Sequence, residues 1–362
     1  MIKVKAPGKL YIAGEYAVVE TGCPAILVGL NKYVYVSIED SKDFGTIISK
    51  QYENSTVVWK RRGEHMVIDN RDNPFEYILS GIRITEQYAQ ELGKKMRCYD
   101  LKIDSELDSP SGKKYGLGSS AAVTVATVKA LCQYYGLNVT LDQLFKLAAG
   151  FFCLLPSIVD LTAHVPGVFC GVVHLIRHLG HRLLRIRIAV AGFGERVVVG
   201  FQFALHVVEG GFGIVEFDRL NLLIGWTGSP ASTSNLVDKV ELSKEERRKK
   251  YLEFVHESSK CVEQMEASFQ KHDLPGIQQC LRKNRKLLEN LHEITGVEIE
   301  TPTLKYLIKS AERFGGAAKT SGAGGGDCGI VLIDSSIDTT PLLDEWTKHD
   351  IIPLDLSVHY ND

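Results

Sequence analysis

The sequence lacks a long uncharged apolar run, a closely spaced pair of cysteines and an excess of charge of either sign. Its most apolar later stretch, residues 161–176, is too short to span a bilayer and contains His164, Pro166 and His174. Lysine and arginine number 42 and aspartate and glutamate 44, so the formal net charge is −2. A membrane-spanning protein and a partner such as nucleic acid are therefore not predicted.

The eight cysteines are scattered, with no CxxC pair and no close cysteine–histidine spacing of a metal site. The first residues of the chain contain no apolar segment of the kind found in secretory leaders. Both observations fit free thiols in a reducing compartment, and we expect a cytoplasmic protein.

The 362 residues, of which 44% are hydrophobic, suggest two domains. Runs of β-branched and aromatic residues separated by glycine and charged turns predict strands up to about residue 68. Helical spacing and capping residues predict helices at about 74–92, 119–135, 274–292, 301–315 and 341–348, with two more beginning at Thr140 and Ser243. Further strands are predicted at 99–103, 329–333 and 354–359. The order predicts an α/β or α+β enzyme in two halves.

A glycine-rich turn leads directly into the predicted helix at 119–135, with the sequence Lys113-Lys114-Tyr115-Gly116-Leu117-Gly118-Ser119-Ser120-Ala121-Ala122. Small residues let the backbone approach a phosphate, and the N–H groups and dipole at a helix N-terminus favour an anion. The turn has neither the GxxxxGK[ST] nor the GxGxxG pattern. A phosphate-binding turn is predicted, and the alternative is a small-residue helix packed tightly on a sheet.

Two other runs carry candidate chemistry. Residues 319–329, Lys-Thr-Ser-Gly-Ala-Gly-Gly-Gly-Asp-Cys-Gly, contain five glycines, which indicates a loop whose backbone approaches something closely. A flexible linker is the alternative, but Lys319, Asp327 and the apolar strand that follows argue against it. Near the N-terminus, residues 6–18 read Ala-Pro-Gly-Lys-Leu-Tyr-Ile-Ala-Gly-Glu-Tyr-Ala-Val. A lysine in a Pro-Gly turn, taken alone, is typical of a solvated surface.

In their order along the chain and in their spacing, the three runs resemble the motifs of the GHMP kinase superfamily, whose members phosphorylate small metabolites with ATP. The first motif resembles residues 5–18, the second residues 116–122 and the third residues 319–329. Within the superfamily, the sequences of these motifs are most similar to those of the bacterial phosphomevalonate kinases. Residues 223–233, Leu-Ile-Gly-Trp-Thr-Gly-Ser-Pro-Ala-Ser-Thr, add to the similarity. The resemblance implies an N-terminal domain like ribosomal protein S5 domain 2 over residues 1–220 and a ferredoxin-like C-terminal domain over 221–362. ATP and substrate would bind in the cleft between them.

The resemblance also implies the reaction and its residues. The γ-phosphoryl of Mg-ATP would move to the terminal phosphate of (R)-5-phosphomevalonate, giving the diphosphate used in isoprenoid synthesis. Lys9 would be catalytic, and Ser120 would offer a hydroxyl to Mg²⁺. ATP would be held by the turn formed by Lys113, Lys114, Gly116, Leu117, Gly118, Ser119, Ser120 and Ala121. The substrate would contact Lys9, Tyr16, Ser229, Ser232, Thr233, Ser321, Gly322, Ala323, Gly324 and Gly325.

One segment departs from the family. The family's Gly-Asp motif, whose aspartate is a catalytic candidate, and its following Gly-Trp strand are missing from residues 150–219, where Asp160 is the nearest carboxylate. Residues 147–219 also contain no lysine, asparagine, tyrosine or tryptophan, yet hold five of the eleven histidines: His164, His174, His178, His181 and His206. His174, His178 and His181 have helical spacing, yet no cysteine or acidic partner nearby makes them a metal site, so a zinc site is not expected.

The change in composition and the loss of sequence similarity to the family have the same boundaries. We therefore hypothesise that this segment is translated out of the ancestral reading frame, between an indel and a compensating one. Two alternatives to an active phosphomevalonate kinase stay open at this point. One is a catalytically impaired relative that still binds ATP, and the other is a different GHMP member such as mevalonate kinase or the decarboxylase.

Overall fold

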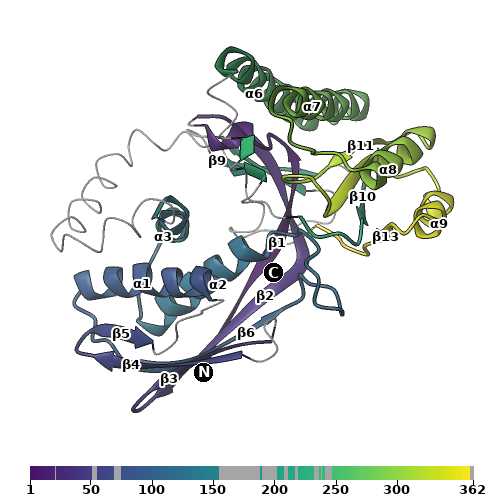
Figure 1. Cartoon of the computed structure of the whole chain (residues 1–362). Helices are drawn as coiled ribbons and strands as arrows, with labels where there is room; N and C mark the ends of the chain where they lie inside the picture. The colour runs from purple at the N-terminus through teal and green to yellow at the C-terminus, as the bar shows by residue number, and fades with distance from the viewer. Residues whose placement is uncertain are drawn as a thin grey trace. The chain divides into compact units, whose positions relative to one another are not determined.

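Two compact units, whose segments alternate along the chain, make up the fold of the computed structural model (Figure 1). The described residues are 1–20, 22–50, 55–68, 75–154, 188–189, 202–207, 211–216, 219–231, 236–237, 239–240 and 247–358. The first unit comprises Met1–Gly8, Lys32–Gly112 and Gly118–Leu175, and the second comprises Lys9–Asn31, Lys113–Leu117 and Ile176–Asp362. The predicted domain division after residue 220 stays a prediction.

A seven-stranded sheet has the order β1-β2-β6-β3-β4-β5, with β7 paired to β2. Its strands are β1 (Ile2–Ala13), β2 (Ala25–Ser41), β3 (Gly45–Ser49), β4 (Ser55–Arg62), β5 (His65–Ile68), β6 (Cys98–Ser105) and β7 (Ile188–Ala189). The pairs β2–β6, β3–β4 and β4–β5 are antiparallel, and β3–β6 and β2–β7 are parallel. In β2, Val34, Val36 and Ile38 are buried at every second position, as the side-chain alternation of a strand requires.

The described residues of the first unit form three helices: α1 (Glu76–Glu91), α2 (Ser119–Tyr134) and α3 (Leu141–Leu154). Figure 1 shows α1 and α2 side by side over the sheet, and residues of the two helices are in contact. The capping box predicted at Thr140 is confirmed: Gln143 N–H donates to the Thr140 hydroxyl at 3.2 Å, and Thr140 N–H donates to the Gln143 side chain at 2.8 Å. Gly93 follows α1 with a φ of +72°, as predicted for a glycine that ends a helix.

The second unit contains a four-stranded antiparallel sheet of order β11-β12-β10-β13, made of β10 (Leu220–Trp226), β11 (Ala317–Thr320), β12 (Cys328–Asp334) and β13 (Ile352–Pro353). Its helices are α6 (Arg248–Gln270), α7 (Leu274–Thr295), α8 (Pro302–Arg313) and α9 (Thr340–Lys348). A short helix, η1 (Ala17–Val19), and a hairpin of β8 (Gln202–Val207) and β9 (Gly211–Glu216) also belong to it. The core between α8, α9 and the sheet includes Leu307, Val331 and Trp346, all fully buried.

Two predictions at element ends have different outcomes. Thr301 caps α8 as predicted, because its hydroxyl accepts from Leu304 N–H at 3.4 Å and Pro302 follows it. The last strand, predicted at 354–359, was wrong: β13 covers only Ile352–Pro353, and Val358 makes an isolated bridge. The Leu356 N–H donates back to the Leu354 carbonyl at 2.9 Å, so the chain turns there instead of extending beside β10. The helix start predicted at Ser243 lies outside the described residues, and α6 is described from Arg248.

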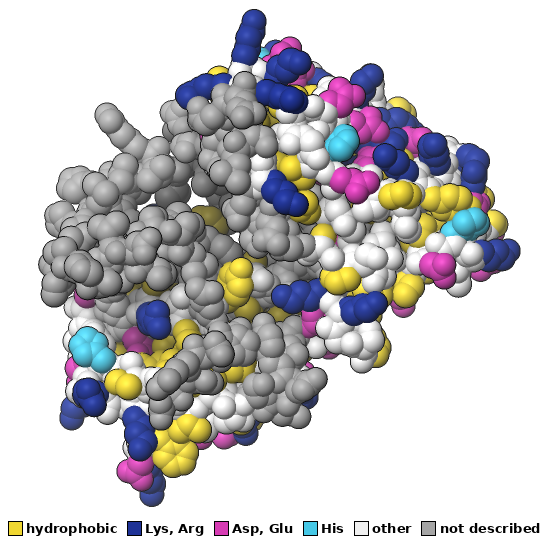
Figure 2. Space-filling view, in the orientation of Figure 1, with side chains coloured by type: hydrophobic (Ala, Val, Ile, Leu, Met, Phe, Trp, Pro, Cys, Tyr) yellow, Lys and Arg dark blue, Asp and Glu magenta, His cyan; other side chains and the backbone are white. Residues whose placement is uncertain are grey.

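The described surface bears no dominant charge on the face that Figure 2 shows, where basic and acidic side chains are interspersed. Within the described part of the chain, no helix has the length and hydropathy needed to cross a membrane. The described ranges also contain no group of three or more histidine, cysteine, aspartate or glutamate residues that could hold a metal ion. The three histidines at helical spacing, His174, His178 and His181, lie outside those ranges.

Candidate active site

Lys9 is attached to the glycine-rich turn through its backbone. It lies on β1, and its N–H donates to the Leu117 carbonyl at 2.8 Å. The ammonium group stands over the Tyr11 ring, 4.1 Å from the centroid. A cation over an aromatic face is stabilised by the ring quadrupole. The first and second motifs are thus in direct contact within the second unit.

The turn after β1 holds a buried carboxylate. Gly14 has a φ of +94°, and a Cβ there would lie 2.6 Å from the Pro24 carbonyl oxygen, so the chain can turn here only with glycine. The turn places Glu15 inside the protein with 2% of its surface exposed, where it forms an ion pair with the fully buried Lys319 of β11. The Lys319 ammonium also donates to the Thr320 carbonyl at 2.6 Å. This pair joins the first motif to the third.

Two further hydrogen-bond contacts hold the third motif against the first. The Ser321 hydroxyl accepts from the Tyr11 N–H and donates to the Tyr11 carbonyl, both at 2.9 Å, so it pairs with Tyr11 as a neighbouring strand would. The Tyr16 phenol donates to the Ala323 carbonyl at 2.6 Å. Burial and the charge of Glu15 raise the pKa of Tyr16, and they raise the pKa of Tyr11 to about 12, so both phenols stay protonated at neutral pH.

Asp327 lies where three segments meet. Its N–H donates to the Ser229 carbonyl at 2.8 Å, and its carboxylate accepts from the Ala231 N–H at 2.9 Å. Its other carboxylate oxygen faces Gly116 closely enough that a Cβ on Gly116 would lie 2.7 Å from it. Asp327 also has a φ of +52°, an uncommon conformation for a residue with a side chain. Strain of this kind persists where the surrounding contacts over-determine the backbone, and it is typical of functional sites.

The charge state of Lys9 depends on two carboxylates. Burial lowers the pKa of Lys9 to about 8, while the negative charges of Glu15 and Asp327 raise it. For Asp327, burial raises the pKa, and the Ala231 N–H, Lys9 and Lys114 lower it. Lys9 is therefore mostly a cation at neutral pH, and it loses its proton as the pH rises through about 8. Such a perturbed cation beside carboxylates is the type of group found in active sites.

The turn that leads into α2 has the features of an anion site. Gly116 and Gly118 have φ values of +82° and +75°, which favour glycine, and α2 begins at Ser119. Gly118 caps the helix without a side-chain hydrogen bond, and the first turn of α2 has no acidic residue. The N–H groups of a helix start are left for water or a ligand in that case, and the helix dipole attracts negative charge. Ser119, Ser120 and Ala121 are partly exposed.

The glycine loop of the third motif rests on the protein at two points. The Gly325 N–H donates to the Ile299 carbonyl at 2.8 Å, and Gly326 packs against the Ser229 carbonyl. At Gly322, by contrast, an added Cβ would meet nothing within 4 Å. The loop is thus fixed at its second half and has room at its start.

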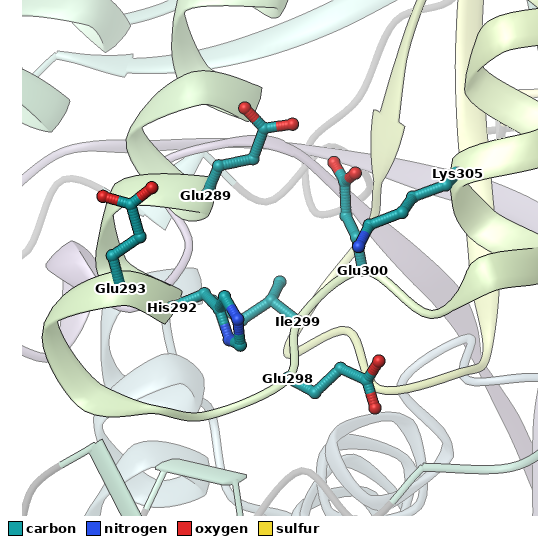
Figure 3. Close-up of a pocket in the computed structure, with 7 residues that line it drawn as sticks. All are labelled: Glu289, His292, Glu293, Glu298, Ile299, Glu300 and Lys305. Carbon is teal, nitrogen blue, oxygen red and sulfur yellow. The ribbon is translucent and has the colours of Figure 1, made fainter.

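A pocket at the end of α7 has the wrong charge for a nucleotide. It encloses about 230 Å³, and Figure 3 shows its lining residues: Glu289, His292, Glu293, Glu298, Ile299, Glu300 and Lys305. With four carboxylates against one lysine, the lining has a net negative charge that would repel phosphates. Glu300 is 6% exposed and already paired with Arg285 at 2.8 Å. We therefore do not assign ATP to this pocket.

The predicted site residues have different outcomes. In the second unit Lys9, Tyr16, Ser321 and Ala323 come together as described above, and Ser229 contributes its carbonyl to Asp327. Lys113 and Lys114 are exposed. Asp160, Ser232 and Thr233 lie outside the described residues. Glu15 and Asp327 were not predicted as site residues, although Glu15 lies inside the first motif and Asp327 inside the third. A charged residue next to glycine was the available signal.

Comparisons with known proteins identify both halves of the chain. The model of the GHMP kinases N-terminal domain matches residues 77–152, and that of the GHMP kinases C-terminal domain matches residues 265–350. A phosphomevalonate kinase of Streptomyces sp. (strain CL190) is 33% identical over 97% of this chain and 96% of its own length. A mevalonate kinase of Thermococcus gammatolerans is 27% identical over 96% of each chain.

Solved structures give the same result. The crystal structure of the Lin0012 protein from Listeria innocua has a TM-score of 0.77 and 30% identity, and the match covers 100% of this chain and 98% of that chain. The Streptococcus pneumoniae phosphomevalonate kinase in complex with phosphomevalonate and AMPPNP has a TM-score of 0.71 and 25% identity, over 99% of this chain and 100% of that chain. The two-domain mixed α/β fold implied by the sequence is confirmed.

Proposed function

Because the chain belongs to the GHMP kinase family, we propose that it is a phosphomevalonate kinase, which transfers the γ-phosphoryl group of ATP to the phosphate of (R)-5-phosphomevalonate. The observation that carries the proposal is the assembly of Lys9, Tyr16, Asp327 and the Ser321–Ala323 loop around one buried ion pair. The product would be the diphosphate used in isoprenoid synthesis. A cytoplasmic location is part of the proposal, because it fits the free thiols of the described cysteines.

Two anionic reactants need positive charge and fixed geometry. In phosphoryl transfer, most of the catalysis is positioning and electrostatic stabilisation of the oxygens that carry charge. Lys9 would supply charge to the transferred group, and the N–H groups of Ser119, Ser120 and Ala121 would bind ATP phosphates. These residues fit a nucleotide because the start of α2 has no side-chain cap and no acid in its first turn.

Mg²⁺ would complete the nucleotide site. A divalent cation neutralises phosphate charge, and in kinases it is held by few protein ligands together with the substrate phosphates and water. The Ser120 hydroxyl is the ligand that we propose for it in this chain. The substrate would contact Tyr16, Ser229, Ser232, Thr233 and the Ser321–Gly325 loop.

An alternative function is favoured by the sequence of residues 150–219. Without the family's Gly-Asp motif, the chain would bind ATP at the start of α2 but turn over slowly or not at all. This alternative and the kinase proposal share the nucleotide site, and they differ in whether ADP is released in the presence of an acceptor.

The experiment measures ADP release by the purified chain with Mg-ATP and phosphomevalonate, mevalonate or no acceptor, alongside ATP binding by calorimetry. Release that requires phosphomevalonate supports the proposal. Release with mevalonate instead assigns the chain to the other kinase. Binding without release in either case supports the impaired relative, and absence of ATP binding by the folded chain contradicts both.

Lys9→Met, paired with Lys3→Met, tests the role of Lys9. Lys3 is an exposed lysine of the same strand and lies over a tyrosine ring, as Lys9 does. Loss of Lys9 is expected to lower kcat about 100-fold, because one charge that stabilises the transition state is removed. Lys3→Met is expected to keep turnover within about twofold, the range of surface substitutions away from a site. Equal effects of the two variants would remove Lys9 from the catalytic residues.

A further inference from the structure

Helices α6 and α7 lie antiparallel, and contacts along their length fix which residues face each other. Glu257 of α6 forms an ion pair with Lys283 of α7 at 3.1 Å. The Ser268 hydroxyl of α6 lies 2.8 Å from the position of a Cβ on Gly276 of α7. Residue numbers rise along α6 as they fall along α7, so residues near 261 and 280 must be opposite each other.

Two cysteines occupy that position. The Cys261 Sγ–H donates to the Cys280 carbonyl oxygen at 3.2 Å, and the two thiol groups interact with each other. Cys261 is fully buried and Cys280 is 8% exposed. A disulfide needs two cysteines whose side chains converge from closely spaced backbones, and facing positions of packed helices bring backbones together.

The two thiols have opposite reactivity. The interaction with Cys261 and the positive charge of Lys283 lower the pKa of Cys280, whereas the interaction with Cys280 and burial raise the pKa of Cys261. A thiolate is the nucleophilic form of cysteine. Cys280 keeps 8% of its surface exposed, whereas Cys261 is fully buried, so Cys280 is the sulfur that reacts first and Cys261 is the neighbour that resolves the product.

We propose that Cys261 and Cys280 form a redox-sensitive dithiol that peroxide converts into a disulfide between α6 and α7. The Cys280 thiolate attacks one peroxide oxygen, the O–O bond breaks, and Cys280 becomes a sulfenic acid. The hydroxide that leaves takes up the proton that the Cys280 thiol lost when it ionised, which gives the first water. The Cys261 sulfur then attacks the Cys280 sulfur, the S–O bond breaks, and the Cys261 proton leaves with the hydroxyl as water. Both cysteines are oxidised by one electron each, and peroxide is reduced to water.

The inference is independent of the proposed function, because neither cysteine belongs to the site assigned to ATP or substrate. The disulfide would join two helices at positions 19 residues apart. Closing a loop of that length restricts the unfolded chain, and the melting temperature is expected to rise by about 5 °C. Oxidation would thus stabilise the packing of α6 against α7 in the second unit.

The test treats the native full-length chain with hydrogen peroxide and maps its peptides by mass spectrometry without reduction. We expect a mass loss of about 2 Da, two hydrogen atoms, in a peptide that joins Cys261 to Cys280. In Cys261→Ser, a sulfenic-acid trapping reagent is expected to label Cys280. In Cys280→Ser, no label is expected at Cys261. Dithiothreitol should reverse the mass loss and the rise in melting temperature.

Cys132 provides the matched control, since it is a buried cysteine whose pKa is raised to about 11 by burial alone. Cys132→Ser is expected to keep the oxidation of the pair unchanged. A folded wild-type chain in which peroxide leaves both cysteines reduced would overturn the proposal. A disulfide that forms only after unfolding in urea would overturn it too, and the wild-type measurement decides this even if a serine variant fails to fold.

Discussion

The Lys319 ammonium and the Glu15 carboxylate form an ion pair inside the protein, with 0% and 2% of their side-chain surfaces exposed. The pair joins β11 to the turn after β1, and its members are 304 positions apart in the sequence. The other Glu15 oxygen, Oε2, is buried and has no hydrogen-bond partner among the described residues. Such a pair contributes stability only while both charges are present, because either alone is a desolvated charge.

Lys319→Met is therefore expected to lower the free energy of unfolding by about 3–5 kcal/mol, since it leaves Glu15 buried without its cation. Urea unfolding followed by circular dichroism measures the change. Lys309→Met, at an exposed lysine of α8, is the control and is expected to stay within about 0.5 kcal/mol of wild type. The double variant Glu15→Gln/Lys319→Met should recover part of the loss. Equal stability of Lys319→Met and the control would mean that the pair is not desolvated.

Gly116→Ala tests the contact between the phosphate turn and Asp327. Two effects are expected: strain of about 1 kcal/mol from the positive φ, and a clash of the new Cβ with the Asp327 carboxylate. Because the clash moves the loop that is proposed to bind ATP, the KM for ATP should rise about tenfold or more. Steady-state kinetics at varied ATP measures it.

Gly112→Ala separates strain from contact. Gly112 has a φ of +77°, close to the +82° of Gly116, but a Cβ there meets nothing within 4 Å. This variant should lose about 1 kcal/mol of stability and keep its KM for ATP. If the two variants had the same KM, the approach of Asp327 to Gly116 would have no role in nucleotide binding.

Much of the fold could be predicted from local signals. The Thr140 capping box, the Thr301–Pro302 helix start and the glycine after α1 each depend on residues within one helical turn, so a single sequence contains the whole signal. The last strand was wrong because its extent depends on pairing with β10, which is distant in the sequence.

The candidate site also has a part that local sequence predicts and a part that depends on contacts between distant residues. The glycine-rich runs were visible because their composition is local. The contacts that assemble them, Glu15 with Lys319 and Asp327 with Gly116, join positions hundreds of residues apart, and no periodicity or spacing in one sequence specifies such pairs. A charged residue inside a motif with glycines was the available local signal for Glu15 and Asp327, but it does not specify what either carboxylate contacts.

The reading-frame hypothesis for residues 150–219 makes a prediction about the gene. Translating the coding DNA of this window in a shifted frame is expected to give a Gly-Asp-Ile-Ala-like sequence and a Gly-Trp strand. A chain with that frame restored should release ADP with phosphomevalonate faster than the chain described, because the missing aspartate returns. The hypothesis is discarded if neither shifted frame contains the motif.

The pH dependence of turnover follows from Lys9. With a pKa of about 8, Lys9 loses its positive charge as the pH rises through that value. The kcat/KM of the free enzyme should therefore fall above about pH 8. Stability has the opposite sign: the folded pKa lies below the unfolded value, so between about pH 8 and 10.5 the unfolded chain binds more protons, and the contribution of Lys9 to stability rises with pH.

The fall of kcat/KM above about pH 8 is the alkaline limb of the pH–rate profile, and removing a carboxylate near Lys9 should shift the pH of this limb. Glu15 and Asp327 each raise the pKa of Lys9, so Asp327→Asn is expected to shift the alkaline limb to lower pH while it keeps an oxygen for the Ala231 N–H. Lys9→Arg should abolish the limb, because guanidinium stays charged throughout the range. Asp334→Asn is the control: Asp334 is the last residue of β12, whereas Asp327 directly precedes that strand, and this variant should leave the alkaline limb in place. A limb that stays at the same pH in Asp327→Asn, or one that persists in Lys9→Arg, would show that another group titrates there.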